Sequence, residues 1–364
     1  MCHGTGNVCG HNSSDVLALL DFKKAVITGK PDGALSSWNT STPFCQWSGV
    51  LCSKKHPGRV VKLHLSHQGL LGPISPYLGN LTLLRELNLS NNNLSGQLPP
   101  LSRIHTLQVV DLANNSLHDT IPDTLANCSK LRTLNLSRNF LVGEIPLKVG
   151  LLSNLKELVL PRNNLRGAIP RTISNITSLK LIVLLYNQLN GSIPDELGKL
   201  PNLSELYLTG NNLRGYIPQS IFNLSSLHAL TAFGNMLVGV VPPNIGNALP
   251  NLEVLLLGGN MFGGHIPASL GNASKLTWID FMDNSFVGTI GEWIGKLTNL
   301  DSIYLEGNNF TGPIPRSISN LSQLTRLDLS SNNLIGAPGE WIGKLTKLKY
   351  LKHQENNFIG SILN

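Results

Sequence analysis

The sequence predicts an α/β solenoid, a rod built by stacking short repeats, and three observations predict it. The string L-x-x-L-x-L-x-x-N-x-L-x-G-x-I-P recurs along the 364 residues. Charged residues make up only 13% of the chain, whereas glycine and asparagine, which suit turns, are abundant. The asparagine position recurs at a spacing close to 24: Gln68, Asn92, Asn115, Asn139, Asn163, Asn187, Asn211, Asn235, Asn260, Asn284, Asn308, Asn332 and Asn356. A fixed period of this length indicates stacked units, so we expect thirteen repeats over residues 60–364, the last one incomplete and uncapped.

Each repeat is expected to begin with a short strand of the form x-L-x-L-x. Alternate residues point to opposite faces of a strand, so in one repeat Leu206 and Leu208 point inward and Tyr207 points outward. The asparagine side chain then bonds to backbone groups where the strand bends away. Gly215 and Pro218 turn the chain. Stacking these units predicts a curved superhelix with a parallel sheet on its concave face.

Residues 13–59 are expected to form an N-terminal cap. Ser14 and Asp15 suit the first turn of a helix, and the apolar residues that follow recur with the helical period. This helix would cover the open end of the leucine core. Trp38 and Trp47 are predicted to pack beneath it as core residues.

The five cysteines divide into three groups. Cys45 and Cys52 lie just before the first repeat, where a disulfide would staple the cap. Cys128 is expected to be a buried free thiol. Residues 1–12, a leader of unknown role, contain a cluster whose spacing matches no standard zinc pattern, so we expect a second disulfide or a disordered leader there. That cluster consists of Cys2, His3, Cys9 and His11.

Charge and hydropathy exclude several classes of protein. The net charge is +7, and residues 130–180 alone hold nine Lys or Arg and two Glu. This basic zone lacks the interleaved aromatic residues of a nucleic-acid-binding stripe, so no nucleic-acid partner is expected. The sequence has no apolar run of 18 residues, so no membrane span is expected within it. Its first ten residues also lack the apolar region of a signal peptide.

The glycosylation sequons nevertheless favour an extracellular protein. N-x-S/T occurs more often than chance predicts, and a cytosolic repeat has no reason to retain it. The missing signal peptide then indicates a start that has been trimmed, misassigned or lost. One further sequon lies at Asn12 in the leader. The expected acceptors in the cap and repeats are Asn39, Asn80, Asn88, Asn93, Asn114, Asn127, Asn135, Asn175, Asn190, Asn202, Asn223, Asn272, Asn309 and Asn320.

The outward strand positions change character from repeat five to repeat eleven. Earlier repeats place small or polar residues there, whereas these repeats place large apolar and aromatic ones. Such an apolar patch on a soluble surface usually marks an interaction site, and Tyr and Trp are typical of binding hot spots. The alternatives are a dimer interface or partial cover by flanking side chains. The predicted apolar contacts are Val159, Val183, Leu185, Tyr186, Tyr207, Phe233, Leu256, Trp278, Met282 and Tyr304.

Charged residues follow the same face. Arg138 and Arg162 precede the asparagine in repeats four and five, and Asp280 and Asp283 lie in repeat ten, followed by Glu306 and Asp328 in outward positions. No sequon falls on an outward strand position from repeat five onward. Six strand spacings of about 4.8 Å span about 29 Å, enough for about nine extended residues. We therefore expect an extended peptide with an apolar middle, an acidic group near the arginines and a basic group near the aspartates.

The sequence does not indicate an enzyme. Its histidines are scattered, it has no G-x-S-x-G motif or phosphate loop, and Asp280 with Asp283 resembles a solvated charge patch more than an acid–base pair. No cofactor or metal is expected.

The motifs together resemble a known family. D-V-L-A-L-L-D-F-K from Asp15, L-S-S-W-N from Leu35, C-Q-W-S-G-V-L-C from Cys45 and the repeats ending in L-x-G-x-I-P are similar to the plant extracellular type of leucine-rich repeat. That type forms the ectodomains of plant leucine-rich-repeat receptor-like serine/threonine kinases. Finer details resemble the subfamily with receptors for flagellin, elongation factor Tu and rice bacterial-blight peptides. The resemblance covers residues 12–364 and implies peptide binding on the concave face and recruitment of a co-receptor kinase.

The chain departs from that family at its end. The family continues into further repeats, a membrane helix and a kinase, whereas this sequence stops within a repeat at Asn364 and has no kinase motif. We therefore expect a C-terminally truncated ectodomain at the extracellular face of the plasma membrane, signalling through a kinase absent from this chain. The alternative is a secreted inhibitor or decoy that resembles the polygalacturonase-inhibiting proteins.

Overall fold

The computed structural model describes residues 14–28, 33–39, 41–337 and 339–359. The predictions for the leader, including Cys2, Cys9 and Asn12, lie outside these residues. The chain forms two compact units, Met1–Arg166 and Gly167–Asn364. Each unit is described by itself.

Both units consist of repeats that contribute one strand to a front sheet and one to a side sheet. The front sheet is formed by the predicted x-L-x-L-x segments. The side sheet is formed by the segments after the asparagine, which the sequence predicted only as turns. The sequence prediction is corrected here for a simple reason. A short segment that follows each ladder asparagine forms a strand before the chain turns, and this strand is parallel to the equivalent strand of the next repeat.

In the first unit, the front sheet follows the order β2-β3-β5-β7-β9-β11. Its strands are β2 (Val50–Cys52), β3 (Val60–His64), β5 (Glu86–Asn88), β7 (Val109–Asp111), β9 (Thr133–Asn135) and β11 (Glu157–Val159). The side sheet comprises β1 (Ile27–Thr28), β4 (Leu70–Pro73), β6 (Asn93–Gly96), β8 (Ser116–Thr120), β10 (Phe140–Gly143) and β12 (Asn164–Ala168). The β2–β3 and β1–β4 pairs are antiparallel, and the later pairs are parallel.

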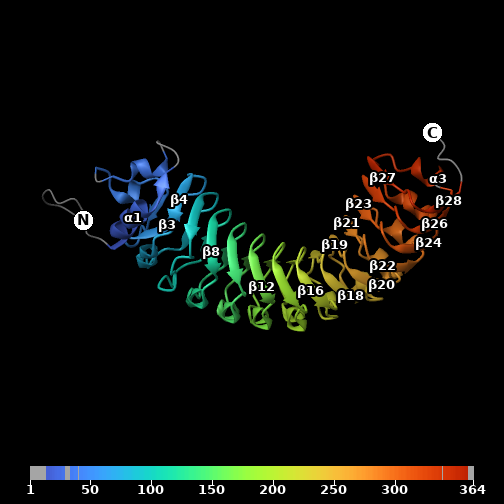
Figure 1. Ribbon diagram of the computed structural model, residues 1–364, viewed down its shortest axis with the longest axis horizontal. Coiled ribbons are helices and arrows are strands. Elements are labelled where there is room, and N and C mark those ends of the chain that lie inside the picture. Colours follow the sequence, from blue (N-terminus) through green and yellow to red (C-terminus); the bar gives the residue numbers. More distant parts are fainter. Residues whose placement is uncertain (1–13, 29–32, 40, 338, 360–364) are drawn as a thin grey trace. The chain divides into compact units, whose positions relative to one another are not determined.

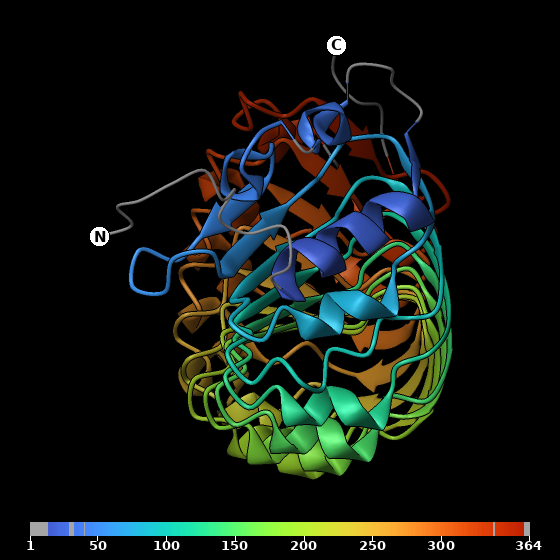
Figure 2. The ribbon, with the colours of Figure 1, turned by 90° about the vertical axis from the view of Figure 1, so that its left-hand side faces the viewer.

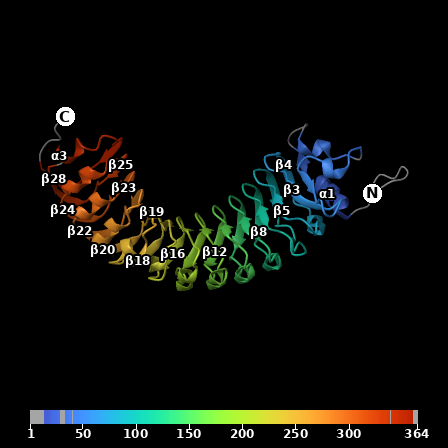
Figure 3. The same ribbon diagram turned by 180° about the vertical axis from the view of Figure 1, so that it is seen from behind.

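In the second unit, the front strands β19, β21 and β23 lie along the inner edge of the unit, and the side strands β18, β20 and β22 lie along its outer edge (Figure 1 and Figure 3). The front strands are β13 (Leu181–Val183), β15 (Glu205–Tyr207), β17 (Ala229–Thr231), β19 (Val254–Leu256), β21 (Trp278–Asp280), β23 (Ser302–Tyr304), β25 (Arg326–Asp328) and β27 (Tyr350–Lys352). The side strands are β14 (Gln188–Gly191), β16 (Asn212–Gly215), β18 (Met236–Val240), β20 (Met261–Gly264), β22 (Ser285–Gly288), β24 (Asn309–Pro313), β26 (Asn333–Gly336) and β28 (Asn357–Phe358).

Short helices connect the side strand of one repeat to the front strand of the next. Most of them begin one to three residues after a proline, and η3 begins at one, because proline fixes a backbone angle that suits a first helical position or the residue before it; η10 instead follows Gly291. These helices are η3 (Pro76–Asn80), η4 (Asp123–Asn127), η5 (Leu147–Leu151), η6 (Arg171–Asn175), η7 (Asp195–Lys199), η8 (Ile221–Asn223), α2 (Ile245–Ala248), η9 (Ala268–Asn272), η10 (Glu292–Lys296), η11 (Arg316–Asn320) and α3 (Gly339–Ile342).

A ladder of buried asparagines joins consecutive repeats, as the sequence predicted. Asn211 is representative: its Nδ2 donates to the carbonyl oxygens of Leu184 (3.0 Å) and Leu208 (2.9 Å), and its Oδ1 accepts from the Leu189 amide (3.1 Å). One side chain thus satisfies backbone groups of its own repeat and of the preceding one. Because buried backbone groups are costly when unpaired, the ladder fixes the stacking of the repeats.

Replacing Asn211 with Ala is expected to lower the free energy of unfolding by about 2 kcal/mol, because a buried amide and two carbonyls lose partners. Urea denaturation followed by circular dichroism measures the change. The matched control is Asn212→Ala, which alters the exposed neighbour and should change stability by less than about 0.5 kcal/mol. Equal effects of the two substitutions would contradict this role of the ladder.

The cap is built on helix α1 (Ser14–Ala25), which lies across the N-terminal end of the first unit (Figure 2). Its residues Leu19 and Phe22 are fully buried. Trp38 and Trp47 are buried as predicted, and their rings stack with centroids 5.2 Å apart. Aromatic packing therefore closes the leucine core at this end.

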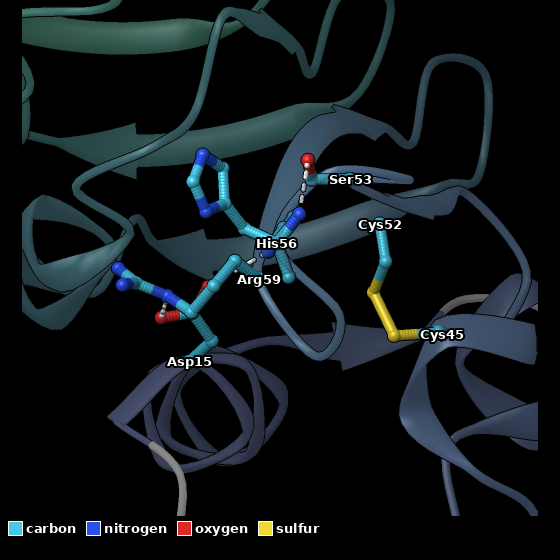
Figure 4. Close-up of a disulfide and its surroundings, with 7 residues drawn as sticks. Asp15, Cys45, Cys52, Ser53, His56 and Arg59 are labelled. Carbon is cyan, nitrogen blue, oxygen red and sulfur yellow. Dashed lines mark hydrogen bonds and ion pairs between the residues drawn. A yellow bond between two sulfur atoms is a disulfide. The ribbon is translucent and has the colours of Figure 1, made fainter. Parts of the chain in front are cut away.

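The predicted disulfide between Cys45 and Cys52 is present and closes a short loop that leads into β2, with the two Cα atoms 5.4 Å apart (Figure 4). Cys128 is a buried free thiol, and burial raises its pKa to about 11. Its sulfur lies 3.4 Å from the carbonyl oxygen of Leu101, so it serves as a core residue.

Candidate functional site

The strand register of the second unit places most of the predicted contact residues in rows across its front sheet. Val183 pairs with Tyr207, Tyr207 with Thr231, and Thr231 with Leu256. The row continues through Asp280, Tyr304 and Asp328. Leucine, tyrosine and carboxylate side chains predicted from separate repeats therefore form one continuous row.

A second row follows two residues later in each repeat. It contains Leu185, Phe233, Met282 and Glu306, all half-buried. Tyr186 follows Leu185 in a left-handed conformation (φ 53°), which carries its ring over the next repeat. The ring lies against Gly210, where a Cβ atom would come within 2.5 Å of Tyr186 Cδ1. Gly210 therefore makes room for a tyrosine that is 49% exposed.

Three predicted contact residues belong to the first unit. Arg138 and Arg162 are exposed and adopt left-handed conformations just before the ladder asparagine (φ 53° and 55°), and Val159 is half-buried on β11. The other eleven belong to the second unit, where the structure brings them together. A link between the two arginines and those eleven residues stays a prediction.

The outward residues are less exposed than the sequence suggests. Strands lie about 4.8 Å apart, so large side chains in one row cover one another. Trp278 is 41% exposed, but Asp280 is only 7% exposed. The expectation that Asp280 belongs to an open, solvated pair of carboxylates is therefore wrong.

Asp280, Asp283 and Glu306 form an acidic cluster in the tenth and eleventh repeats. Burial, reinforced by the charge of Asp283, raises the pKa of Asp280 to about 6. Burial also raises the pKa of Glu306 to about 7, and the nearby charges of Asp328, Asp280 and Asp283 add to this effect. Both carboxyl groups thus gain or lose protons close to neutral pH.

The acidic cluster lacks a cationic partner within the described part of the chain. No described Lys, Arg or His lies within ion-pair distance of its three carboxylates. The Glu306 Oε2 atom is buried and makes no hydrogen bond to any described residue. By contrast, the neighbouring Asp328 has Lys352 Nζ 3.6 Å away and accepts from the Ser330 hydroxyl at 2.6 Å. A buried, unpaired carboxylate is unfavourable by itself and favours an external cation.

Glycosylation sequons leave this front sheet free. In the second unit, the sequon asparagines lie on the side sheet or on the connecting helices and turns, and their side chains are exposed: Asn175, Asn190, Asn202, Asn223, Asn272, Asn309 and Asn320. In the first unit, Asn39, Asn93, Asn114 and Asn127 are also exposed. Asn80 is half-buried there, as are Asn88 and Asn135 on the front sheet, whose Oδ1 atoms accept from the hydroxyls of Ser90 (2.8 Å) and Ser137 (2.7 Å).

The contribution of Ser302 and Arg326 to this surface was not predicted from the sequence. Neither residue is apolar, so a search for large outward residues passes over both. Both residues could have been found by aligning the repeats, since they occupy the same repeat position as Trp278. The strand register pairs these three positions across β21, β23 and β25.

The sequence of the chain matches known families of repeats. Residues 12–53 match the leucine rich repeat N-terminal domain. Residues 153–213, 274–335 and 298–358 match one leucine rich repeat family, and residues 83–103, 106–128, 130–152 and 251–273 match another. The chain belongs to the leucine-rich-repeat family. The predicted fold class, a leucine-rich-repeat solenoid with a helical cap and a parallel sheet, is confirmed.

The relatives of the chain are plant leucine-rich-repeat receptor-like kinases. The LRR receptor-like serine/threonine-protein kinase EFR of Arabidopsis thaliana is 43% identical over 98 residues, which are 27% of this chain and 9% of that protein. The plant peptide hormone receptor RGFR1 in complex with RGF2 has a TM-score of 0.73 and 32% identity, covering 81% of this chain and 51% of that one. The PEPR1–AtPEP1 structure has a TM-score of 0.72 and 34% identity, covering 95% and 55%. The chain therefore spans about half of each solved receptor chain.

None of the helices that the structure describes has the length and apolar composition of a membrane span.

Proposed function

We propose that the chain is the ligand-binding ectodomain of a plant cell-surface receptor kinase and binds an extended peptide on the front sheet of its second unit. The observation that carries the proposal is the sequon-free row of apolar, aromatic and acidic side chains on that sheet. The similarity to receptors of the RGFR1 and PEPR1 kind supports it. The proposal places the chain at the extracellular face of the plasma membrane, with no catalysis of its own.

The dimensions of the sheet suit a peptide. From β13 to β23 the row crosses five strand spacings, about 24 Å in all, which matches about seven extended residues at about 3.3 Å each. Val183, Tyr207 and Leu256 offer half-buried contacts for an apolar middle segment. The acidic cluster at the end of the row attracts a basic group. The ligand is therefore a short peptide, apolar in the middle and basic toward the end that meets β21 and β23.

Signalling by such a receptor requires a kinase, which we assign to a further part of the protein, and a co-receptor ectodomain that joins the peptide-bound form. This assignment rests on the family resemblance.

Tyr207 provides the test of the proposed surface. It is half-buried in the row, and its hydroxyl donates to Glu205 Oε2 at 2.7 Å, which fixes the ring. Burial, with the bond to Glu205, raises its pKa, so it stays neutral. Replacing Tyr207 with Ala is expected to weaken the binding of a peptide selected from a random library on the wild-type chain by about 2 kcal/mol, or about 30-fold. Isothermal titration calorimetry measures the change.

The matched control is Tyr216→Ala. Tyr216 is 69% exposed and follows β16 of the side sheet, so its replacement should leave peptide affinity within a factor of about two. Selected peptides that lose affinity with Tyr216→Ala but not with Tyr207→Ala would move the site to the side sheet. If no peptide of the library bound the chain, the proposed function would be wrong.

A further inference from the structure

A slot opens in the front sheet between β21 and β25. Trp278, Ser302 and Arg326 occupy equivalent positions on three adjacent strands. Serine is short, so a cavity of about 320 Å³ remains between its two long neighbours. Thr277, Asp301 and Tyr304 complete the lining. Ser302 is 4% exposed, so it forms the floor beneath the two walls.

The width of the slot fits one planar group. The backbones that carry Trp278 and Arg326 are two strand spacings apart, about 9.6 Å. A ring held between two flat groups needs about 7–8 Å between their planes, because carbon atoms in contact lie about 3.5–4.0 Å apart. One aromatic ring therefore fits, and two do not.

The walls of the slot differ in chemistry. Trp278 is 41% exposed and presents an indole face. The Arg326 side chain is 54% exposed, and Nη1 lies 3.4 Å from Asp301 Oδ2. Asp301 also accepts from the hydroxyls of Ser302 (2.7 Å) and Thr325 (2.8 Å), and these bonds, the Ser302 bond foremost, lower its pKa. An ionised Asp301 holds the guanidinium at the wall.

These features select among side chains. A lysine or arginine would meet the positive charge of Arg326. A carboxylate would find Arg326 already paired, with the acidic cluster next to it. An aliphatic side chain would gain burial only, whereas an aromatic ring would also gain stacking on the indole and a cation–π contact with the guanidinium.

We propose that this slot binds an aromatic side chain of the peptide ligand, stacked between Trp278 and Arg326. The proposal rests on the proposed function and narrows its substrate class. Asp280 follows Trp278 by two residues on β21, about 6.6 Å along the strand. The ligand accordingly carries its aromatic residue close to its basic residue.

The first test uses probes that need no peptide. N-acetyl-L-tyrosinamide and N-acetyl-L-leucinamide are titrated into the chain labelled with 15N-tryptophan, and the Trp278 indole resonance is assigned by its absence in Trp278→Phe. The tyrosinamide should shift this resonance at millimolar concentration, and the leucinamide should not. Ser302→Trp, which fills the slot, should abolish the shift. Equal responses to the two amides, or a shift that persists in Ser302→Trp, would contradict the proposal that the slot binds an aromatic side chain.

Two milder variants cover the case in which Ser302→Trp does not fold. Trp278→Leu keeps an apolar wall without a ring, and Arg326→Gln keeps a planar polar group without the charge. In Arg326→Gln the tyrosinamide shift of the Trp278 resonance should weaken at least threefold. Trp278→Leu lacks that resonance, so its affinity for the tyrosinamide is measured by calorimetry and should also fall at least threefold. Thermal unfolding of both variants should stay unchanged. For a library-selected peptide, changing its aromatic residue to Leu should cost at least tenfold in affinity on the wild-type chain and little on Trp278→Leu. A peptide that depends on Tyr207 but binds Trp278→Leu and Arg326→Gln normally would remove the slot and leave the proposed function standing.

Discussion

Replacing Asp15 with Ala is expected to lower the free energy of unfolding by about 3 kcal/mol, because a buried amide and a half-buried guanidinium lose a charged acceptor. Asp15 is fully buried in α1. Its Oδ1 accepts from Arg59 Nε at 3.0 Å and its Oδ2 accepts from the Val60 amide at 2.8 Å (Figure 4). The same arginine donates to the Thr82 hydroxyl at 2.7 Å. One carboxylate thus joins the cap helix to the first strand of the repeats, and its loss leaves the buried Val60 amide without an acceptor and the guanidinium without its anionic partner.

The measurement is urea denaturation followed by tryptophan fluorescence, because Trp38 and Trp47 report on the cap. Asp21→Ala is the matched control: Asp21 lies on the same helix and accepts one hydrogen bond, from the Ser75 hydroxyl at 2.7 Å. Its replacement should cost about 1 kcal/mol. Similar midpoints for Asp15→Ala and Asp21→Ala would show that the Asp15–Arg59 ion pair does not hold the cap.

The role of Asp15 also shows what sequence reasoning could reach. The helix, its first-turn acid and the repeats were predictable because they depend on local periodicity, and so was the asparagine ladder, because each copy meets the same backbone groups. The bond between Asp15 and Val60 joins residues 45 positions apart and occurs once. The side sheet was missed because most of its strands contain a glycine and end close to a proline, a combination that is typical of a turn.

Some features of the candidate site could likewise be predicted from the sequence, and others could not. Outward positions such as Tyr207 and Trp278 could be predicted, because strand alternation fixes the face. The burial of Asp280 and the unpaired Glu306 oxygen depend on how side chains 24 residues apart overlap. The slot could not be predicted either, because Ser302 forms its floor only when Trp278 and Arg326 lie on the two neighbouring strands.

The affinity for a basic peptide is expected to rise at least tenfold between pH 5.5 and pH 7.5 and to stay flat for the same peptide with its lysine changed to glutamine. In the free chain, the pKa of Asp280 is about 6 and that of Glu306 about 7, both above the ordinary range. Carboxyl groups with raised pKa values are more stable protonated, so ionising them destabilises the fold as pH rises from about 4 through 7. A bound ammonium group removes this penalty by pairing with the carboxylates. Binding is therefore linked to proton release and strengthens with pH, which calorimetry across the pH range measures directly.

The double variant Asp280→Asn/Glu306→Gln should bind the lysine peptide about 100-fold more weakly at pH 7.5, or about 3 kcal/mol, and should lose the pH dependence. Without a ligand it should be more stable than the wild type at pH 7.5 and close to it at pH 5, because it lacks the carboxylates that are costly to ionise. Asp111→Asn is the matched control: Asp111 lies on the front sheet of the first unit and accepts from the amide two residues later at 3.1 Å, as Asp280 does. If the control reduced the affinity as much as the double variant, the basic group would bind elsewhere. If the double variant kept the full pH dependence, other groups would control it, and the acidic cluster would be a feature of the fold alone.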